Sequence, residues 1–188
     1  MLGKKIATSN EVKKLLKVSK ERSVSEAAKS DYAAIVIMVG AGLRRFEVCD
    51  LMAADIDFSA NLITVRHGKG DKRREVVLTD WVKTEIKDYI DTLAKTDYIF
   101  TTKRTHHKVA ADKSALHRRV KALMKMVDCR DCVSAHSLRH AFATNNLRNG
   151  VSLAGVRDLL GHSSVSVTSE YLHFIGEDAD RAKKIKPY

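Results

Sequence analysis

The chain has 188 residues, and its 34 Lys and Arg against 23 Asp and Glu give a formal net charge of +11. An apolar content of 44%, three cysteines and the lack of any apolar run of about 18 residues exclude an intrinsically disordered chain, a disulfide scaffold and a membrane-spanning helix. With no secretory signal at its start, the chain is expected in a reducing, cytoplasmic setting, and its charge favours nucleic acid as the partner.

The first part of the chain reads as helical. A capping box at Thr8 and Glu11 begins a Lys-rich helix with one apolar stripe. A second helix over residues 25–39 is apolar on most of its sides, so we expect it at the centre of the core. Glycines end this helix, and a shorter helix over residues 45–52 follows.

The pattern then changes from helices to strands. Apolar and β-branched runs at residues 62–65 and 75–78 predict two strands, and the Gly- and Asp-containing segment 66–73 between them predicts a hairpin turn. These residues indicate a small antiparallel sheet of two or three strands. A helix over residues 80–93 is expected next.

The second half of the chain returns to helices. Residues 101–111 are polar, basic and without periodicity, which predicts a loop. Further helices are predicted over residues 112–126, 137–148, 152–160 and 165–173, followed by a charged tail. The expected fold class is therefore α+β, mainly α, with residues 1–175 as one domain.

Basic and nucleophilic side chains stand beside several of these turns and helix ends. His136, Arg139 and His140 are spaced three and four residues apart, so they share one face of a helix. The candidates for site chemistry are Arg44, Lys69, His136, Arg139, His162 and Tyr171.

Four blocks of sequence carry a family resemblance. They are residues 41–47 (AGLRRFE), 68–70 (GKG), 136–140 (HSLRH) and 160–162 (LGH), the last followed nine residues after His162 by Tyr171. Each block alone is weakly specific, but together and in this order they are highly specific. The chain resembles the catalytic domain of the tyrosine recombinases, or phage integrase family, over about residues 8–174. Ala41 stands where this family usually has threonine.

The resemblance implies cleavage of DNA by a tyrosine hydroxyl. This reaction leaves a 3′-phosphotyrosine and a free 5′-hydroxyl, so strands are rejoined without ATP, metal or any other cofactor. By resemblance, Tyr171 is the nucleophile, while Arg44 and Arg139 bind the non-bridging phosphate oxygens. Lys69 is the general acid for the leaving 5′-oxygen, and His136 accepts the tyrosine proton.

Three further residues are assigned by the same resemblance. His162 donates a hydrogen bond to a non-bridging oxygen. Glu47 orients Arg44 or His136, and His140 supports the site from within the helix.

The basic surface is expected to bind duplex DNA around this site, because phosphate contacts position a protein on DNA. His106 and His107 belong to the same basic loop as three of the candidates. The candidate DNA-binding residues are Lys72, Arg73, Lys103, Arg104, Lys108, Arg118 and Arg119. The implied partner is double-stranded DNA with a specific core site, bound by a homotetramer whose subunits are monomeric when free.

The chain starts almost at the catalytic domain, whereas most family members carry an N-terminal core-binding domain. It is therefore expected to be a fragment of a longer protein or a short recombinase similar to the fimbrial switch inverters. The tail, residues 176–188, corresponds to the segment that family members exchange between subunits, so we expect it to dock on a neighbouring subunit.

Three other functions remain open from the residues: a non-enzymatic DNA-binding relative, a metal-dependent nuclease and a type IB topoisomerase. The pair Cys129 and Cys132 has no partner motif at zinc-finger spacing, so no metal site is expected there.

Overall fold

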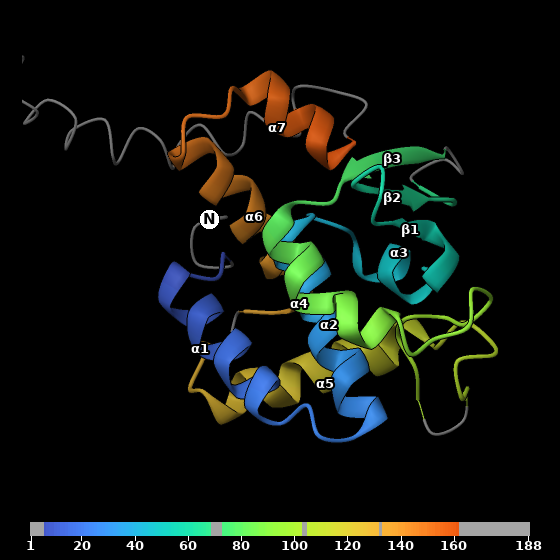
Figure 1. The fold of residues 1–188 in the computed structure, drawn as a ribbon. Coiled ribbons are helices and arrows are strands. Elements are labelled where there is room, and N and C mark those ends of the chain that lie inside the picture. Colours follow the sequence, from blue (N-terminus) through green and yellow to red (C-terminus); the bar gives the residue numbers. More distant parts are fainter. Residues whose placement is uncertain (1–5, 69–72, 103–104, 132, 162–188) are drawn as a thin grey trace, which may run out of the picture.

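The structure is a computed structural model that describes residues 6–68, 73–102, 105–131 and 133–161. Figure 1 shows the chain folded as a group of helices with a small sheet on one side. The elements in chain order are α1 (Ser9–Glu21), α2 (Glu26–Gly40), α3 (Arg45–Cys49), η2 (Ala53–Asp55), β1 (Ile56–Asp57), β2 (Leu62–Val65), β3 (Arg74–Val77), α4 (Asp80–Ile90), α5 (Lys113–Met126), α6 (Ala135–Arg148) and α7 (Leu153–Leu160).

Helix α2 is the centre of the core, as its all-round apolar pattern predicts. Ile35, Ile37 and Met38 are completely buried in it. Helices α1, α4, α5 and α6 all pack against α2 (Figure 1). A helix that is apolar on every side is stable only when neighbours cover every side, and here four helices do so.

Helix α1 begins with the predicted capping box. Thr8 Oγ1 accepts from the Glu11 amide at 3.2 Å, and Glu11 Oε2 accepts from the Thr8 amide at 2.8 Å. The Arg130 guanidinium also donates to Glu11, and this bond lowers the pKa of Glu11 to about 2 despite its partial burial. The cap therefore also ties α1 to the segment that follows α5.

The sheet has three antiparallel strands in the order β1-β2-β3. Ile63 of β2 pairs with Ile56 of β1 and with Val76 of β3, and all three side chains are buried. One face of the sheet therefore closes the core, while the alternate positions face outward. The hairpin that joins β2 to β3 contains residues 69–72, which lie outside the described residues.

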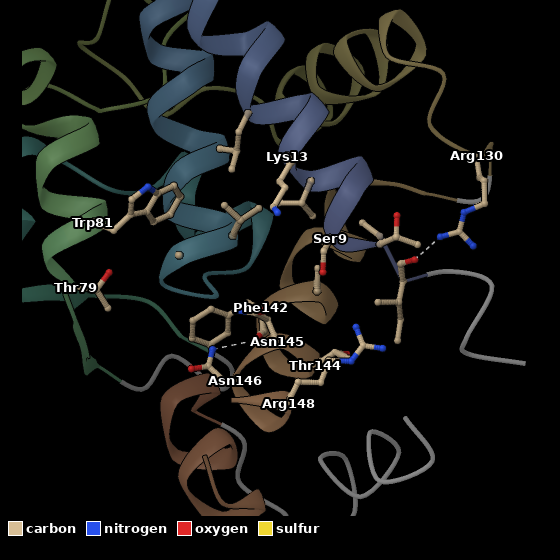
Figure 2. Close-up of a pocket in the computed structure, with 18 residues that line it drawn as sticks. Ser9, Lys13, Thr79, Trp81, Arg130, Phe142, Thr144, Asn145, Asn146 and Arg148 are labelled. Atoms are coloured by element: carbon tan, nitrogen blue, oxygen red, sulfur yellow. Dashed lines mark hydrogen bonds between the residues drawn. The ribbon is translucent and has the colours of Figure 1, made fainter. Parts of the chain in front are cut away.

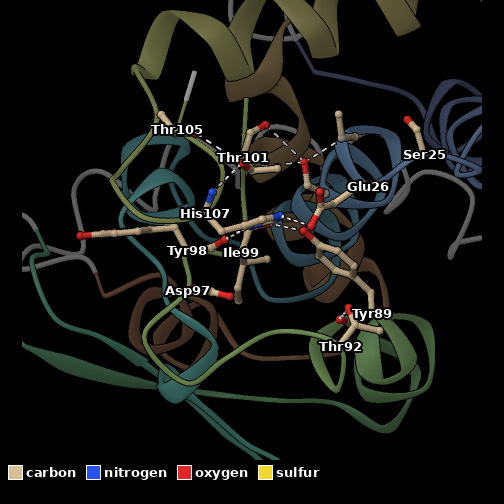
Figure 3. Close-up of polar contacts among 12 residues, drawn as sticks. Ser25, Glu26, Tyr89, Thr92, Asp97, Tyr98, Ile99, Thr101, Thr105 and His107 are labelled. Carbon is tan, nitrogen blue, oxygen red and sulfur yellow. Dashed lines mark hydrogen bonds and ion pairs between the residues drawn. The ribbon is translucent and has the colours of Figure 1, made fainter. Parts of the chain in front are cut away.

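A polar cluster closes the core beside the start of α2 (Figure 3). His107 is 4% exposed, and its Nδ1 lies 2.6 Å from the Tyr98 carbonyl oxygen. Its Nε2 lies 3.0 Å from Glu26 Oε1, and its amide donates to Thr101 Oγ1 at 2.9 Å. The loop that the sequence predicts as polar and basic therefore turns His107 inward, where it joins the loop to α2.

Most predicted elements are confirmed, with shifts at their ends. Helix α6 begins at Ala135, two residues before the predicted start, and α3 ends at Cys49 instead of residue 52. The helix predicted over residues 165–173 and the tail lie outside the described residues. No helix of the described segments is both long and apolar enough to cross a bilayer.

Candidate active site

The turn between α2 and α3 sets the position of Arg44. Gly42 has a φ of +66°, and a Cβ there would lie 2.5 Å from Cδ1 of Phe142 on α6. The turn therefore needs a glycine both for its left-handed backbone and for the close approach of the Phe142 ring. Leu43 is completely buried and anchors the segment, and Arg44 follows as the N-cap residue of α3.

Glu47 holds Arg44 by both its backbone and its side chain. Glu47 Oε2 accepts from the Arg44 amide at 2.7 Å, and Oε1 accepts from Arg44 Nη1 at 3.0 Å. The Arg44 side chain is 15% exposed, whereas that of Glu47 is fully buried. Glu47 therefore holds both the backbone and the side chain of Arg44.

A second arginine binds the same carboxylate. Arg74, the first residue of β3, donates from Nη1 to Glu47 Oε1 at 2.7 Å and from Nη2 to Oε2 at 2.9 Å. Burial alone would raise the pKa of Glu47, but the hydrogen bonds and charges of Arg74 and Arg44 outweigh it and hold that pKa below its usual value. Glu47 is therefore ionised and shared between two arginines.

Sequence analysis missed Arg74, although a signal for it was present. Residues two apart on a strand face the same side. Val76 reads as a core residue of the predicted strand, so Arg74 must face inward with it, while Arg73 and Glu75 face outward. The two-residue alternation of the strand, counted back from Val76, would have predicted that Arg74 faces inward, unlike the exposed basic residues of the hairpin.

Arg139 joins three segments of the chain that are far apart in sequence. It is only 2% exposed on α6. Its Nη1 donates to the carbonyl oxygen of Gly42, and its Nη2 donates to the carbonyl oxygen of Leu160 at 2.7 Å. The turn before Arg44 and the end of α7, two residues before His162, are thus held by one guanidinium.

His136 lies on the exposed side of the first turn of α6, close to these arginines. Partial burial and the positive charges of Arg139, Arg44 and Arg45 lower its pKa below the usual value. Its ring packs edge to face on that of His140, with centroids 4.4 Å apart. His136 lies one turn before Arg139 on α6, and Arg139 contacts the carbonyl of Gly42, two residues before Arg44, so α6 brings these predicted residues to one region.

The other predicted catalytic residues, Lys69, His162 and Tyr171, lie outside the described residues. Their chain neighbours Gly68 and Gly161 are described, and Gly161 ends α7 with a φ of +63° beside Arg74. Three of the predicted DNA-binding residues also lie outside the described segments: Lys72, Lys103 and Arg104.

The described DNA-binding candidates fall into two groups. Arg73, Lys108 and Arg118 have exposed side chains, although Lys108 also donates to Asp97 at 2.5 Å. Arg119 differs, because it donates to Asp31 at 2.9 Å and to the Thr101 carbonyl at 2.6 Å, with its guanidinium over the Phe100 ring. Arg119 thus joins α5 to α2, and its guanidinium is held inside the fold.

A separate pocket of about 820 Å³ lies between α1, α2, the start of α4 and α6 (Figure 2). Trp81, Phe142 and Asn146 line it, whereas Arg44, His136 and Arg139 do not. The candidate site is thus the cationic region beside His136, which is separate from this pocket. Nor do the described residues contain a cluster of three or more His, Cys, Asp or Glu that could hold a metal ion.

The chain is similar to tyrosine recombinases in both sequence and structure. It is 34% identical to a tyrosine recombinase of Pseudothermotoga lettingae over 171 residues, covering 90% of this chain and 56% of that protein. It is also 34% identical to tyrosine recombinase XerA of Thermococcus onnurineus over 181 residues, covering 96% of this chain and 62% of the relative. The chain therefore spans less than two thirds of these relatives.

Solved structures give the same result. A crystal structure of XerA recombinase matches with a TM-score of 0.79 and 28% identity, covering 96% of this chain and 64% of that one. XerH site-specific recombinase, bound to its palindromic difH substrate in a post-cleavage complex, matches with a TM-score of 0.78 and 25% identity, covering 96% of this chain and 53% of that one. The phage integrase family model matches residues 5–176. The predicted family and fold class are thereby confirmed, and the chain belongs to the phage integrase family.

Proposed function

We propose that this chain cleaves and rejoins DNA strands at a specific site through a covalent 3′-phosphotyrosine. The observation that carries the proposal is that the start of α6, with His136 and Arg139, lies against the turn that leads to Arg44. A pocket of fixed positive charge is what a phosphodiester needs when negative charge develops on its non-bridging oxygens. Guanidinium groups stay charged at any working pH, so this stabilisation does not depend on a proton.

The proposed reaction divides among six side chains. The Tyr171 oxygen attacks phosphorus as the bond from phosphorus to the 5′-oxygen breaks. His136 accepts the tyrosine proton, and Lys69 gives a proton to the leaving 5′-oxygen. Arg44, Arg139 and His162 face the non-bridging oxygens. The roles of Lys69, His162 and Tyr171 are inferred from the sequence blocks that resemble those of the tyrosine recombinases.

The lowered pKa of His136 supports its proposed part. A general base must be unprotonated at the working pH, and burial together with the nearby arginine charges lowers the pKa of His136 and so favours its neutral form. When DNA binds, the phosphate charge opposes the arginine charges, so the imidazolium formed by proton transfer becomes less unfavourable. The site therefore favours a neutral base before attack.

Double-stranded DNA is the proposed partner. The net charge of +11 favours a polyanion, and solved relatives such as XerH are bound to DNA substrates. Arg73, Lys108 and Arg118 are the described residues proposed to contact phosphates, together with Lys72, Lys103 and Arg104. We further propose a homotetramer assembled on the DNA, monomeric when free, that acts at the nucleoid, with the tail after residue 175 docked on a neighbouring subunit.

The test is covalent capture of DNA. The chain is incubated with a pool of nicked duplexes of randomised sequence, in which cleavage releases a short fragment and prevents rejoining. Adducts that survive denaturation are isolated and their DNA is sequenced. We expect an adduct that contains one enriched sequence, joined to the protein through its 3′ end.

Two tyrosine variants make this test specific. Tyr171→Phe should abolish the adduct and keep DNA binding, whereas Tyr98→Phe should keep both. An adduct that persists in Tyr171→Phe would show that another nucleophile acts. Adducts without an enriched sequence, together with relaxation of supercoiled plasmid, would indicate a topoisomerase instead.

A further inference from the structure

We propose that Arg74 is a positioning residue for DNA cleavage, acting through Glu47 on Arg44. The inference rests on the proposed function and adds to it a residue outside the six that carry the chemistry. It is drawn from two contacts of the Arg74 side chain, one with a carboxylate and one with the end of α7.

The first contact is a carboxylate shared evenly between two arginines. Each oxygen of Glu47 accepts one hydrogen bond from Arg44 and one from Arg74, at distances of 2.7 to 3.0 Å. The Glu47 side chain is fully buried, so water does not replace any of these bonds. Arg74 donates a hydrogen bond to each oxygen of Glu47, so it fixes the orientation of the carboxylate plane. The carboxylate in turn fixes the position of the Arg44 side chain.

Charge balance gives Arg74 a second effect on Arg44. Glu47 carries one negative charge, which alone would cancel the charge of Arg44 in a poorly solvated region. With Arg74 present, the three groups together keep a net charge of +1. Arg44 therefore remains an effective cation toward a phosphate, even though it is paired with a carboxylate.

The second contact places Arg74 against the segment that leads to His162. A Cβ on Gly161 would lie 2.5 Å from Cδ and 2.6 Å from Nε of Arg74, so the arginine occupies the space beside this glycine. The Nε atom is buried and has no hydrogen-bond partner among the described residues. One residue earlier, the Leu160 carbonyl accepts from Arg139. Arg74 thus touches both α3 and the end of α7.

If Arg74 only stabilises the fold, its replacement gives different results from those expected if Arg74 positions Arg44. A structural arginine changes the fraction of folded protein, whereas a positioning arginine changes the cleavage rate of protein that is folded and bound to DNA. Single-turnover cleavage is therefore measured with saturating protein on the duplex enriched by covalent capture. DNA affinity and thermal unfolding are measured on the same samples.

The variants are Arg74→Met and Arg74→Lys, with Arg66→Met as the matched control. Arg66 stands on the other side of the same hairpin and also pairs with a carboxylate, since its Nε lies 3.1 Å from Asp55 Oδ2. We expect Arg74→Met to slow cleavage by about 10²-fold, because a displaced phosphate ligand commonly costs this much. Arg74→Lys should lie between this variant and the wild type, since an ammonium keeps the charge but cannot bind both oxygens. Arg66→Met should cleave at the wild-type rate.

A double-mutant comparison tests whether Arg74 acts through Arg44. If it does, Arg74→Met should slow cleavage by less than about 2-fold once Arg44→Ala is present, because groups that act as one unit are not additive. The two losses multiplying in full would overturn the inference, as would a wild-type rate for folded Arg74→Met. If Arg74→Met does not fold, the cleavage rate of Arg74→Lys with and without Arg44→Ala tests the inference instead.

Failure of the proposed function gives a separate result. In that case the wild-type chain forms no adduct that depends on Tyr171, and the proposed positioning by Arg74 is wrong together with the proposed function. When the wild type does form that adduct, only the Arg74 variants decide the inference.

Discussion

His136 and His140 pack with their imidazole rings edge to face, at an interplanar angle of 85°, one turn apart on α6. The contact holds the His136 ring on the side of α6 where Arg139 on the same helix and Arg44 and Arg45 at the start of α3 act on its charge. The orientation of a proposed general base therefore depends on a second histidine that need not take part in proton transfer.

Replacing Arg44 should raise the pKa of His136. In Arg44→Gln one of the positive charges that oppose protonation is gone, so the pKa should move up toward 6.5. Arg45→Gln should move it less, because Arg45 contributes less to the shift. The measurement is an NMR titration of the imidazole in the free protein, with Lys20→Gln on α1 as a control that should leave the titration unchanged. A downward shift in Arg44→Gln would contradict the assigned cause.

The same pKa shift has a consequence for stability. A histidine with a lowered pKa binds fewer protons in the folded than in the unfolded chain. Its contribution to the free energy of unfolding should therefore fall as the pH drops through 6.5 toward the folded pKa. His136→Gln should flatten this part of the stability curve, measured by urea unfolding between pH 5 and 8.

Replacing Arg139 should destabilise the fold as well as stop cleavage. Arg139→Met leaves the carbonyl groups of Gly42 and Leu160 without their charged donor, and each such bond contributes about 1.5–3 kcal/mol. We expect a loss of about 3 kcal/mol or more in the free energy of unfolding. Arg157→Met is the control on α7, because its ion pair with Asp158 is exposed and should contribute less than about 1 kcal/mol. Equal losses in both variants would contradict this assignment.

Gly42→Ala should weaken the turn that carries Arg44. The alanine would have to adopt a positive φ, and its Cβ would meet the Phe142 ring. We expect a loss of about 1–3 kcal/mol in stability, together with slower cleavage. In a Phe142→Leu background the added loss caused by alanine should be smaller, because the smaller side chain relieves part of the contact. An unchanged loss would assign the whole effect to the backbone.

The neighbours Arg118 and Arg119 should give opposite results. Arg118→Gln should weaken DNA binding and reduce the slope of log affinity against log salt concentration by about 1, without changing stability. Arg119→Gln should keep that slope but lower the melting temperature, because its bonds to Asp31 and Thr101 are lost. A reduced salt slope in Arg119→Gln would return it to the DNA-binding surface.

The helical part of the fold could be predicted from sequence because its signals are local. The cap at Thr8, the apolar run of α2 and the glycines after it all act within a few residues. Strand β1 was not assigned, because two residues, Ile56 and Asp57, carry no periodicity of their own. Their pairing with β2 is a property of the folded chain.

For the site residues too, local sequence predicted their identity, whereas their contacts depend on the tertiary fold. Arg44, His136 and Arg139 were identified because they stand in sequence blocks, but their contacts could not be predicted. That Arg139 binds carbonyl groups of Gly42 and Leu160 depends on how α6 lies against two other segments. The use of Arg119 within the fold follows from α5 packing on α2, and charge counting alone treats it like Arg118.

Arg139 holds two segments of the chain through their peptide carbonyl groups, those of Gly42 and Leu160. Every residue type presents the same carbonyl oxygen, so exchange of the amino acid at position 160 leaves the acceptor in place. Position 160 can therefore change during divergence without loss of this acceptor, whereas position 42 keeps its glycine because of the left-handed turn. In relatives that keep this arrangement, we therefore expect the residue at position 160 to vary and the arginine at position 139 to be retained.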